Sequence, residues 1–296
     1  MTALTLTLRS PPPRSVDMSA LTPQRLAGLN AAQIGALQLR RGLCVAQVFD
    51  IAAGDVQHVV IRNSCDRLTH IGAAMRSGTI TVEGDCGAYA GLGLNGADLI
   101  VTGNAGSFAG SGMKAGLIRI HGNAGDFAGG ALEGDRQGMR GGTLAIHGDA
   151  GDRAGERMRR GLLLIGGNAG AYCGANMLAG TIFVAGKAGP MPGFSLKRGT
   201  LLLARMPDNL PVTFQDSGEH SLLFLTLLEK QLQRDRPSFA RFLPISQTVR
   251  RYCGGLACGG TGERLVLVCG SVGWSGNVCR ASAVVEIGYA FLLCSV

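Results

Sequence analysis

A glycine triplet that returns at a fixed interval is the feature that most limits what this chain can fold into. Gly84, Gly87 and Gly91 form the pattern G-x2-G-x3-G, and the triplet starts again 19 residues later at Gly103. Four more copies start at Gly122, Gly148, Gly167 and Gly186. One step is 26 residues long, so seven extra residues follow Gly129. A repeat that keeps its phase across an insertion predicts a stack of equivalent units, with the insertion as a loop.

Short apolar segments precede the first glycine of each unit and predict strands, because they are too short for helices and rich in β-branched residues. They cover residues 79–82, 99–101, 117–120, 143–146, 162–165, 181–184 and 200–203. Side chains alternate along a strand, so Ile80 and Val82 share one face with their equivalents in every repeat. The sequence therefore predicts an all-β protein, a right-handed parallel β-helix of about seven 19-residue glycine-rich turns.

Two further columns of side chains recur with the same period. The first is expected to point inward and fill the core, and consists of Met75, Leu94, Met113, Met139, Met158, Met177 and Leu196. The second directly follows the first glycine and consists of Asp85, Asn104, Asn123, Asp149 and Asn168. Asp and Asn tolerate left-handed backbone and can form hydrogen-bonded ladders between turns, so both roles are expected of this column.

The regions outside the repeats are expected to cover the two ends of the stack, because an open end would expose unpaired backbone groups. Residues 1–74 are predicted to form an N-terminal cap with first strands at 4–8, 43–51 and 56–61 and a short helix at 22–31. Residues 75–205 hold the repeats. Residues 206–296 form a C-terminal region in which a helix at 221–233 caps the other end, and the tail beyond about residue 261 has no assigned structure.

Composition excludes several classes of protein. Glycine contributes 47 of the 296 residues, but only ten prolines and 46% hydrophobic residues argue against a disordered chain. The net charge of +8 suits an anionic partner, yet aromatics make up only 5%, so nucleic acid is not expected. No apolar stretch is long enough to span a membrane. Nine cysteines without a secretory signal indicate reduced thiols, and we expect a cytoplasmic protein.

The repeat unit carries a resemblance to a known family. The pattern M-x-x-G-x-[IL]-x-[VI]-x-G-[ND]-A-G-x-x-x-G at residues 113–129 and 158–174 resembles the C subunit of formylmethanofuran dehydrogenase. It looks most similar to the methylotroph form, the C subunit of the formyltransferase/hydrolase complex. The resemblance covers about residues 40–205 and continues weakly at Arg251-Tyr252 and 260–263, although Gly255 stands where the family usually has an acidic residue.

What the resemblance implies is a non-catalytic structural subunit of a complex in one-carbon metabolism. That complex converts formyl-tetrahydromethanopterin to formate through a methanofuran-type carrier during formaldehyde oxidation. Catalysis is expected on partners, namely an amidohydrolase-like subunit that holds zinc and a formyltransferase subunit. This chain is not expected to bind a cofactor or metal or to have its own active site.

Three alternatives stay open beside this interpretation. The chain could serve a formylmethanofuran dehydrogenase oxidoreductase, or it could be a self-sufficient enzyme. The glycine signature also resembles the C-terminal β-helix domain of the glutamate synthase large subunit. That enzyme joins the domain to large catalytic domains, for which 296 residues leave no room, so a free-standing subunit fits better.

The candidate binding site is a row of cations, which we call the basic ladder. It comprises Arg76, Lys114, Arg140, Arg159 and Lys197, which directly follow the Met/Leu column, with Arg160 and Arg198 adjoining. Like charges stacked about 5–10 Å apart repel one another, so the ladder gains nothing by itself. The polyglutamate tail of a carrier or an acidic face of a partner subunit would relieve this repulsion, and simple solvation is the third interpretation.

Other reactive side chains fit structural roles better than chemical ones. His121 and His147 occupy equivalent positions, as do Asp126 and Asp152, and could in principle present two imidazoles and two carboxylates to a metal. Repeat copying places like residues together in any case, so no metal site is expected there. Cys86 and Cys173 replace small residues of the repeat and are expected to be buried packing thiols.

Overall fold

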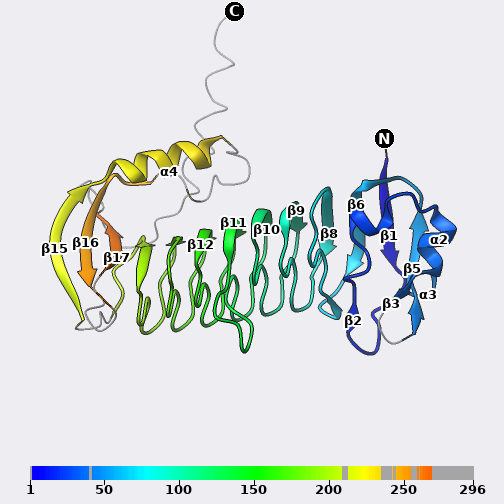
Figure 1. Cartoon of the computed structure of the whole chain (residues 1–296), viewed down its shortest axis with the longest axis horizontal. Helices are drawn as coiled ribbons and strands as arrows, with labels where there is room; N and C mark the ends of the chain where they lie inside the picture. The colour runs from blue at the N-terminus through cyan, green and yellow to red at the C-terminus, as the bar shows by residue number, and fades with distance from the viewer. Residues whose placement is uncertain are drawn as a thin grey trace, which may run out of the picture.

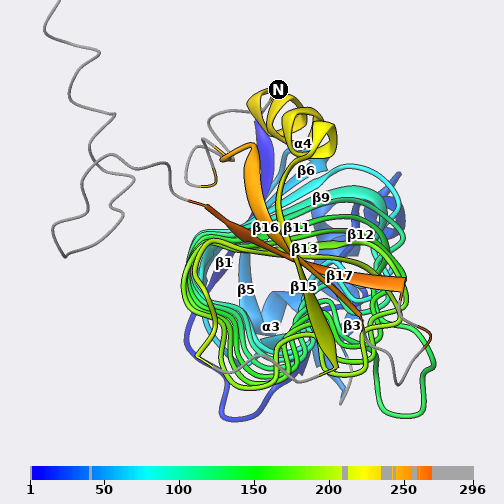
Figure 2. The same cartoon turned by 90° about the vertical axis from the view of Figure 1, so that its left-hand side faces the viewer.

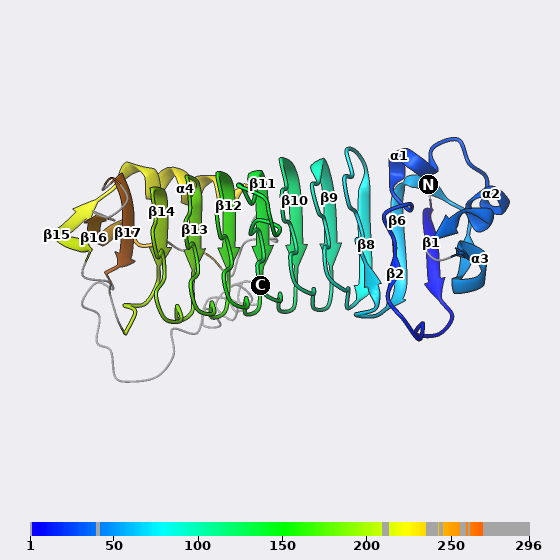
Figure 3. The ribbon, with the colours of Figure 1, turned by 60° about the horizontal axis from the view of Figure 1, so that its bottom comes forward.

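The computed structural model describes residues 2–39, 42–208, 213–234, 242, 245–254, 259 and 261–268. One large sheet of 13 strands dominates it, in the order β15-β16-β17-β14-β13-β12-β11-β10-β9-β8-β6-β1-β5 (Figures 1 and 3). Seven parallel strands, one from each repeat, form its middle. They are β8 (Thr79–Gly84), β9 (Asn95–Val101), β10 (Ala115–Ile120), β11 (Arg140–Ile146), β12 (Arg160–Ile165), β13 (Thr181–Val184) and β14 (Arg198–Leu203). The predicted all-β class and the seven predicted strands are confirmed.

The register of these strands places equivalent residues of successive repeats side by side. Ile80 pairs with Leu99, Leu99 with Ile118, and Ile118 with Leu144. All these side chains are fully buried, as is the entire Met/Leu column, so both predicted core columns are confirmed. Burying one such aliphatic side chain contributes about 1.5–3 kcal/mol. Viewed along the long axis, the chain of each repeat follows nearly the same closed path (Figure 2).

A second parallel ladder runs through the repeats beside the Asp/Asn column. Isolated bridges join Cys86, Ala105, Ala124 and their successors up to Ala188. Next to them, the backbone N–H of Asn123 donates to Asn104 Oδ1 at 2.8 Å, and that of Asp149 donates to Asn123 Oδ1 at 2.8 Å. The predicted hydrogen-bonded ladder is thus present, with each side chain accepting from the backbone of the next repeat.

The expectation of left-handed backbone in the Asp/Asn column is wrong. Positive φ angles occur four residues further on, at Tyr89 (66°), Phe108 (63°) and Phe127 (58°). None of the Asp and Asn residues of the column has a positive φ, and their side-chain oxygens accept the next backbone N–H from this conformation. The corner is made instead at this later position, and its backbone is left-handed also where the residue is not aromatic, at Arg153 (56°) and Met191 (56°).

The N-terminal region continues the sheet and adds small elements around it. Strand β1 (Ala3–Leu8) lies between β6 (Asp55–Ser64) and β5 (Phe49–Ala52), so the expected strands at 4–8 and 56–61 are confirmed. Around them lie β2 (Val16–Asp17), α1 (Pro23–Leu26), α2 (Ala31–Ala36), β3 (Gln38–Leu39), β4 (Leu43–Cys44), α3 (Val45–Val48) and β7 (Leu68–Thr69). The continuous strand expected at 43–51 is wrong, because a helical turn interrupts it. The short helix expected at 22–31 is present only over Pro23–Leu26, and α2 begins at residue 31, where the expected helix would end.

That turn, α3, has a sequence cause. The backbone N–H of Cys44 donates to the side-chain oxygen of Gln47 at 2.9 Å, which closes the start of the helix. Val45 and Val48 are then both buried, at the three-residue spacing of a helix face. The two short helices α1 and α2 are separated at Gly28, whose φ of 80° is left-handed and ends the first of them.

The C-terminal region departs from the expected cap. Helix α4 (Leu223–Gln233) is present where a helix is predicted, but the prediction that it covers the end of the stack is wrong. Its buried residues Leu225, Leu228 and Leu232 pack on the outer face of the sheet, against a group that includes Leu164 and Phe183. The end itself is extended by the strands β15 (Phe214–Ser221), β16 (Thr248–Gly254) and β17 (Thr261–Leu267), as Figure 1 shows.

The helix lies there because the outer face of the last strands is apolar and is buried by it. Leu162, Leu164, Phe183 and Leu202 point away from the inner core yet are almost completely buried. Most of the tail beyond residue 261 lies outside the described residues. Within the part of the chain that is described, no helix is long and apolar enough to cross a membrane, and the cytoplasmic location stays a prediction.

Candidate functional site

The basic ladder lies at the turns that lead into the strands of the sheet, and all seven of its residues are exposed. The backbone N–H of Lys114 donates to Leu94 at 2.8 Å, that of Arg140 to Met113 at 2.7 Å, and that of Arg159 to Met139 at 2.8 Å. Successive members therefore sit directly beside one another in neighbouring repeats, about 4.8 Å apart.

The ladder is not continuous along the whole molecule. Asn95 and Leu178 occupy two of its seven positions, because their backbone N–H groups bind Met75 and Met158 in the same way. Three consecutive cations remain in the middle, Lys114, Arg140 and Arg159. Arg76 stands alone near β8, while Lys197 lies with Arg198 at β14. The structure thus brings three of the five together in one row and separates the other two.

The cations of the ladder have no anionic neighbour among the described residues. None of the seven side chains takes part in an ion pair or a hydrogen bond there, whereas the side chains of other arginines do. Arg9 pairs with Asp50 at 2.8 Å and Arg250 with Asp216 at 2.6 Å. Exposed guanidinium and ammonium groups held in one row can bind several carboxylates or phosphates of one extended ligand or surface.

The two histidines stack but do not gather the carboxylates around them. The rings of His121 and His147 lie 4.9 Å apart, and burial, then the neighbouring charges of His147 and Arg119, lowers the pKa of His121. Asp126 Oδ1 accepts from the backbone N–H of Asp152 at 2.8 Å, so that carboxylate supports the next repeat. No group of three or more His, Cys, Asp or Glu that could hold a metal occurs in the described ranges.

Cys86 and Cys173 are packed inside the repeats, as predicted. Both are buried, and burial raises the pKa of each thiol to about 12. A thiol with this pKa stays protonated at neutral pH and is a poor nucleophile, because the thiolate is the reactive form. These two cysteines therefore contribute packing to the core.

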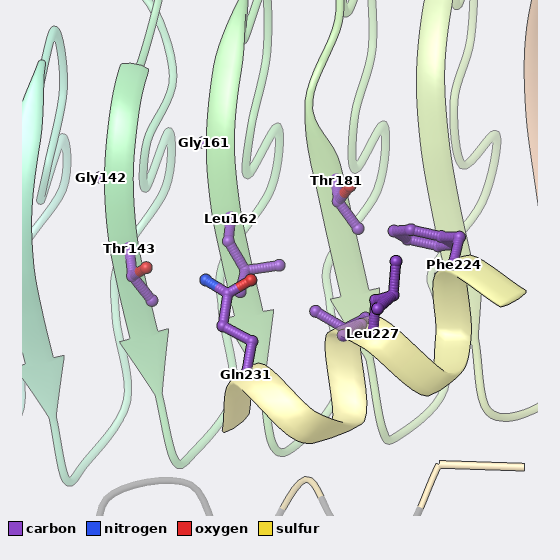
Figure 4. Close-up of a pocket in the computed structure, with 9 residues that line it drawn as sticks. Gly142, Thr143, Gly161, Leu162, Thr181, Phe224, Leu227 and Gln231 are labelled. Atoms are coloured by element: carbon purple, nitrogen blue, oxygen red, sulfur yellow. The ribbon is translucent and has the colours of Figure 1, made fainter. Parts of the chain in front are cut away.

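The sequence did not predict one groove on the surface. A groove of about 410 Å³ runs between α4 and the outer face of β11, β12 and β13, and Figure 4 shows its lining. Its walls include Gly142, Gly161 and Thr181 from the sheet and Phe224 and Leu227 from the helix. The leucines of the helix occupy more than one face, which indicates from sequence alone that one apolar face stays uncovered. The position of the groove, however, depends on which way α4 packs against the sheet.

The sequence analysis also missed a column of stacked rings, although its members recur at one position of successive repeats. His70, Tyr89, Phe108 and Phe127 follow one another in successive repeats, with ring centroids 4.7, 5.3 and 4.8 Å apart. The guanidinium of Arg153 continues the column over Phe127. Aligning the repeats by their glycines would have revealed this stack.

Comparison with known proteins identifies relatives for part and for nearly all of the chain. No family model matches it. A segment is 44% identical over 86 residues to the Fhc C subunit of the formyltransferase/hydrolase complex of Methylorubrum extorquens, covering 28% of this chain and 32% of that protein. Another is 32% identical over 97 residues to the C subunit of tungsten-containing formylmethanofuran dehydrogenase 2 of Methanococcus maripaludis, covering 31% and 36%. The matched segments thus span about a third of these curated relatives.

A solved structure extends the similarity to the whole fold. It is the X-ray crystal structure of the formyltransferase/hydrolase complex FhcABCD from Methylorubrum extorquens in complex with methylofuran. A chain of that structure matches with a TM-score of 0.83 and 42% identity, covering 90% of this chain and 100% of the other.

Sheet and surface together define a class of protein, an all-β glycine-repeat protein with one large, mostly parallel sheet and a row of exposed cations. Within that class, the chain belongs to the C-subunit family of the formyltransferase/hydrolase complex and of formylmethanofuran dehydrogenase.

Proposed function

We propose that this chain is a non-catalytic structural subunit of a formyltransferase/hydrolase complex. The observation that carries the proposal is the match to one chain of the FhcABCD structure, at 42% identity over the full length of that chain. The complex would convert formyl-tetrahydromethanopterin to formate through a methanofuran-type carrier in one-carbon metabolism. Methylofuran is the ligand named for the solved complex, which supports a carrier of this class.

The catalytic steps are proposed to belong to partner subunits. Formyl transfer would fall to a formyltransferase subunit, and hydrolysis of the formyl carrier to an amidohydrolase-like subunit that holds zinc. This chain would supply a long, stiff body on which those subunits are placed. Each repeat contacts chiefly its two neighbours, so such a body keeps positions along its length at fixed spacing.

We further propose that the repeats wind as a right-handed parallel β-helix over residues 75–205, between an N-terminal cap at 1–74 and a C-terminal region at 206–296. The in-register pairing of one strand per repeat and the second ladder of Cys86 and the alanines support this winding. An all-parallel sheet needs a crossover between its strands, and the glycine corners supply a short one.

The basic ladder is proposed to bind carboxylates. Two sources fit its chemistry, the polyglutamate tail of the carrier and the acidic face of a partner subunit. Lys114, Arg140 and Arg159 support both equally, since they are exposed, adjacent and unpaired among the described residues.

One alternative function has a specific observation in its favour. The 32% and 33% identical relatives from Methanococcus maripaludis are subunits of tungsten-containing formylmethanofuran dehydrogenase 2, so a role in that oxidoreductase is the second candidate. Composition of the purified complex separates the two candidates, because only the oxidoreductase brings a tungsten or molybdenum subunit.

The test is isolation of the complex from the native host through a tag at the N-terminus of this chain. We expect mass spectrometry to find an amidohydrolase-like and a formyltransferase subunit in fixed ratio, and metal analysis to find zinc. Recovery of the chain alone would contradict the proposal. Recovery with a tungsten-containing or molybdenum-containing subunit would favour the dehydrogenase instead.

A further inference from the structure

Helix α4 presents two apolar stripes, and the sheet covers only one of them. Leu225, Leu228 and Leu232 are buried against the sheet. Leu223 and Leu227 lie on an adjoining stripe and are 75% and 57% exposed. Residues three or four apart share a helix face, so these two leucines lie on one side of the first turns of the helix. Isolated exposed leucines are ordinary, but two on one stripe beside a hollow mark a binding surface.

Leu227 of the exposed stripe and the neighbouring Phe224 form one wall of the groove between α4 and the sheet. Leu227 and Phe224 project over the strands in Figure 4, and Gly142, Gly161 and Thr181 form the opposite floor. Because these residues are small, they leave space between the strands and the helix. A side chain at Gly161 would place its Cβ 2.7 Å from the carbonyl oxygen of Gly142, and the φ of 104° there also favours glycine. A segment of chain can therefore lie alongside α4 across several strands.

Two cations of the basic ladder stand at the start of strands that form this floor. Arg140 and Arg160 are the first residues of β11 and β12, and they pair with each other in the sheet register. Arg160 directly precedes Gly161, which lines the groove together with Leu162. The surface thus has an apolar wall, a flat floor and a basic edge.

We propose that this groove is the docking site for an acidic amphipathic segment of a partner subunit. One side of that segment would bury apolar side chains against Phe224 and Leu227. Its other side would carry carboxylates to Arg140 and Arg160. The proposal rests on the proposed function, and it names the place and the chemistry of one contact between subunits.

A second copy of this chain fits the groove poorly. Two copies meeting through the same face would bring their arginine rows together, and each copy carries a net charge of +8. The carboxylates of the carrier's tail would satisfy the arginines but leave Leu223 and Leu227 in water. Only an occupant that is both apolar and acidic matches the two sides of the groove.

The test compares two exposed leucines of this chain in assembly with the host's own partner subunits. Leu227→Glu places a carboxylate on the apolar wall, and Leu43→Glu makes the same change at a 38% exposed leucine in the N-terminal region. We expect L227E to weaken assembly by about tenfold or more, as at a central interface residue, and L43E to assemble like the wild type. Matching circular dichroism and melting temperatures would exclude misfolding as the cause.

A second pair of variants tests the basic edge. Arg160→Glu should weaken assembly, whereas Arg76→Glu, in the same ladder but outside the groove, should leave it nearly unchanged. If both arginine variants weaken assembly equally, the groove is not the docking site and the partner contacts the whole ladder instead. A wild-type dimer that L227E converts to a monomer, with assembly intact, would assign the groove to a second copy.

The outcomes separate this inference from the proposed function. Failure of the wild-type chain to join the complex would contradict the function itself. Normal assembly of the wild type together with normal assembly of L227E and R160E would overturn the groove alone.

Discussion

Arg264 occupies a position that neighbouring strands give to an aliphatic side chain. It pairs with Leu201 in the sheet register and is fully buried, and its guanidinium stacks 3.7 Å from the ring centroid of Phe214. None of its three side-chain nitrogens has a hydrogen-bond partner among the described residues. A buried cation without such partners destabilises the folded state, because stacking on one ring replaces only part of the lost hydration.

Replacing Arg264 with leucine is therefore expected to stabilise the protein. The variant continues the aliphatic column of Leu201 and removes the desolvated charge, and we expect a gain of about 1–3 kcal/mol in the free energy of unfolding. Chemical denaturation followed by circular dichroism measures it. Arg264→Lys, which keeps the charge, should bring no gain. A loss of stability in R264L would mean that the guanidinium holds an anion or a carbonyl in solution.

The pH dependence of this gain follows from the direction of the shift. Burial lowers the pKa of Arg264 to about 10, below its value in the unfolded chain, so the unfolded state binds the proton more tightly. The penalty is complete below the folded pKa and fades as the pH rises from about 10 toward the higher pKa of the unfolded chain. The difference between R264L and wild type should consequently be constant from about pH 6 to pH 9.

At the scale of elements, the protein has two separate buried layers, one between α4 and the outer face of the sheet and one inside the repeats. Leu225 packs in the outer layer with Leu228 and Phe183, while the inner core holds the Met/Leu column and residues such as Leu163. We expect Leu225→Ala to cost about 2–4 kcal/mol in the attachment of the helix, because it leaves a cavity in that layer.

Hydrogen exchange locates this loss. In L225A the amides of α4 should exchange much faster, while those of β8 to β10 keep their protection, because local opening leaves the distant repeats folded. The exposed neighbour Leu227→Ala is the matched control and should leave the exchange of α4 nearly unchanged. Faster exchange throughout the sheet in L225A would show that the outer layer and the inner core do not unfold independently.

Sequence reasoning predicted what repetition determines and missed what packing between distant segments determines. The seven strands, the Met/Leu column and the Asp/Asn ladder follow from one period of 19 residues, so each repeat confirms the others. The place of α4 depends on the outward side chains Leu164 and Phe183, whose burial no local pattern reveals. The groove is formed by α4 and the sheet together, so the sequence could predict only the apolar face of the helix and not the groove.

At the scale of the whole molecule, the central repeats behave as equivalent layers of one stack. Strand β8 pairs with β9, and β9 with β10, in the same register, so the surface that β8 offers to β9 matches the one that β9 offers to β10. A stack of this kind is stabilised by contacts between adjacent layers rather than by contacts across its length. Such a stack can therefore lose or gain a whole repeat, but it cannot lose a fraction of a repeat without moving the glycines out of register.

Removing one whole repeat is therefore expected to preserve the fold. Deletion of residues 85–103 joins Gly84 to Asn104, restores the triplet with Gly106, and allows Ile80 to pair with Ile118 in place of Leu99. We expect unchanged β-sheet circular dichroism and a cooperative melt within a few degrees of the wild type. Deletion of residues 85–94 is the control, since it removes about half a repeat and moves the glycines away from the corners. If both deletions unfold the chain, the layers are not equivalent. If both fold, the glycine period does not set the register, and the core columns must owe their alignment to the two ends of the molecule.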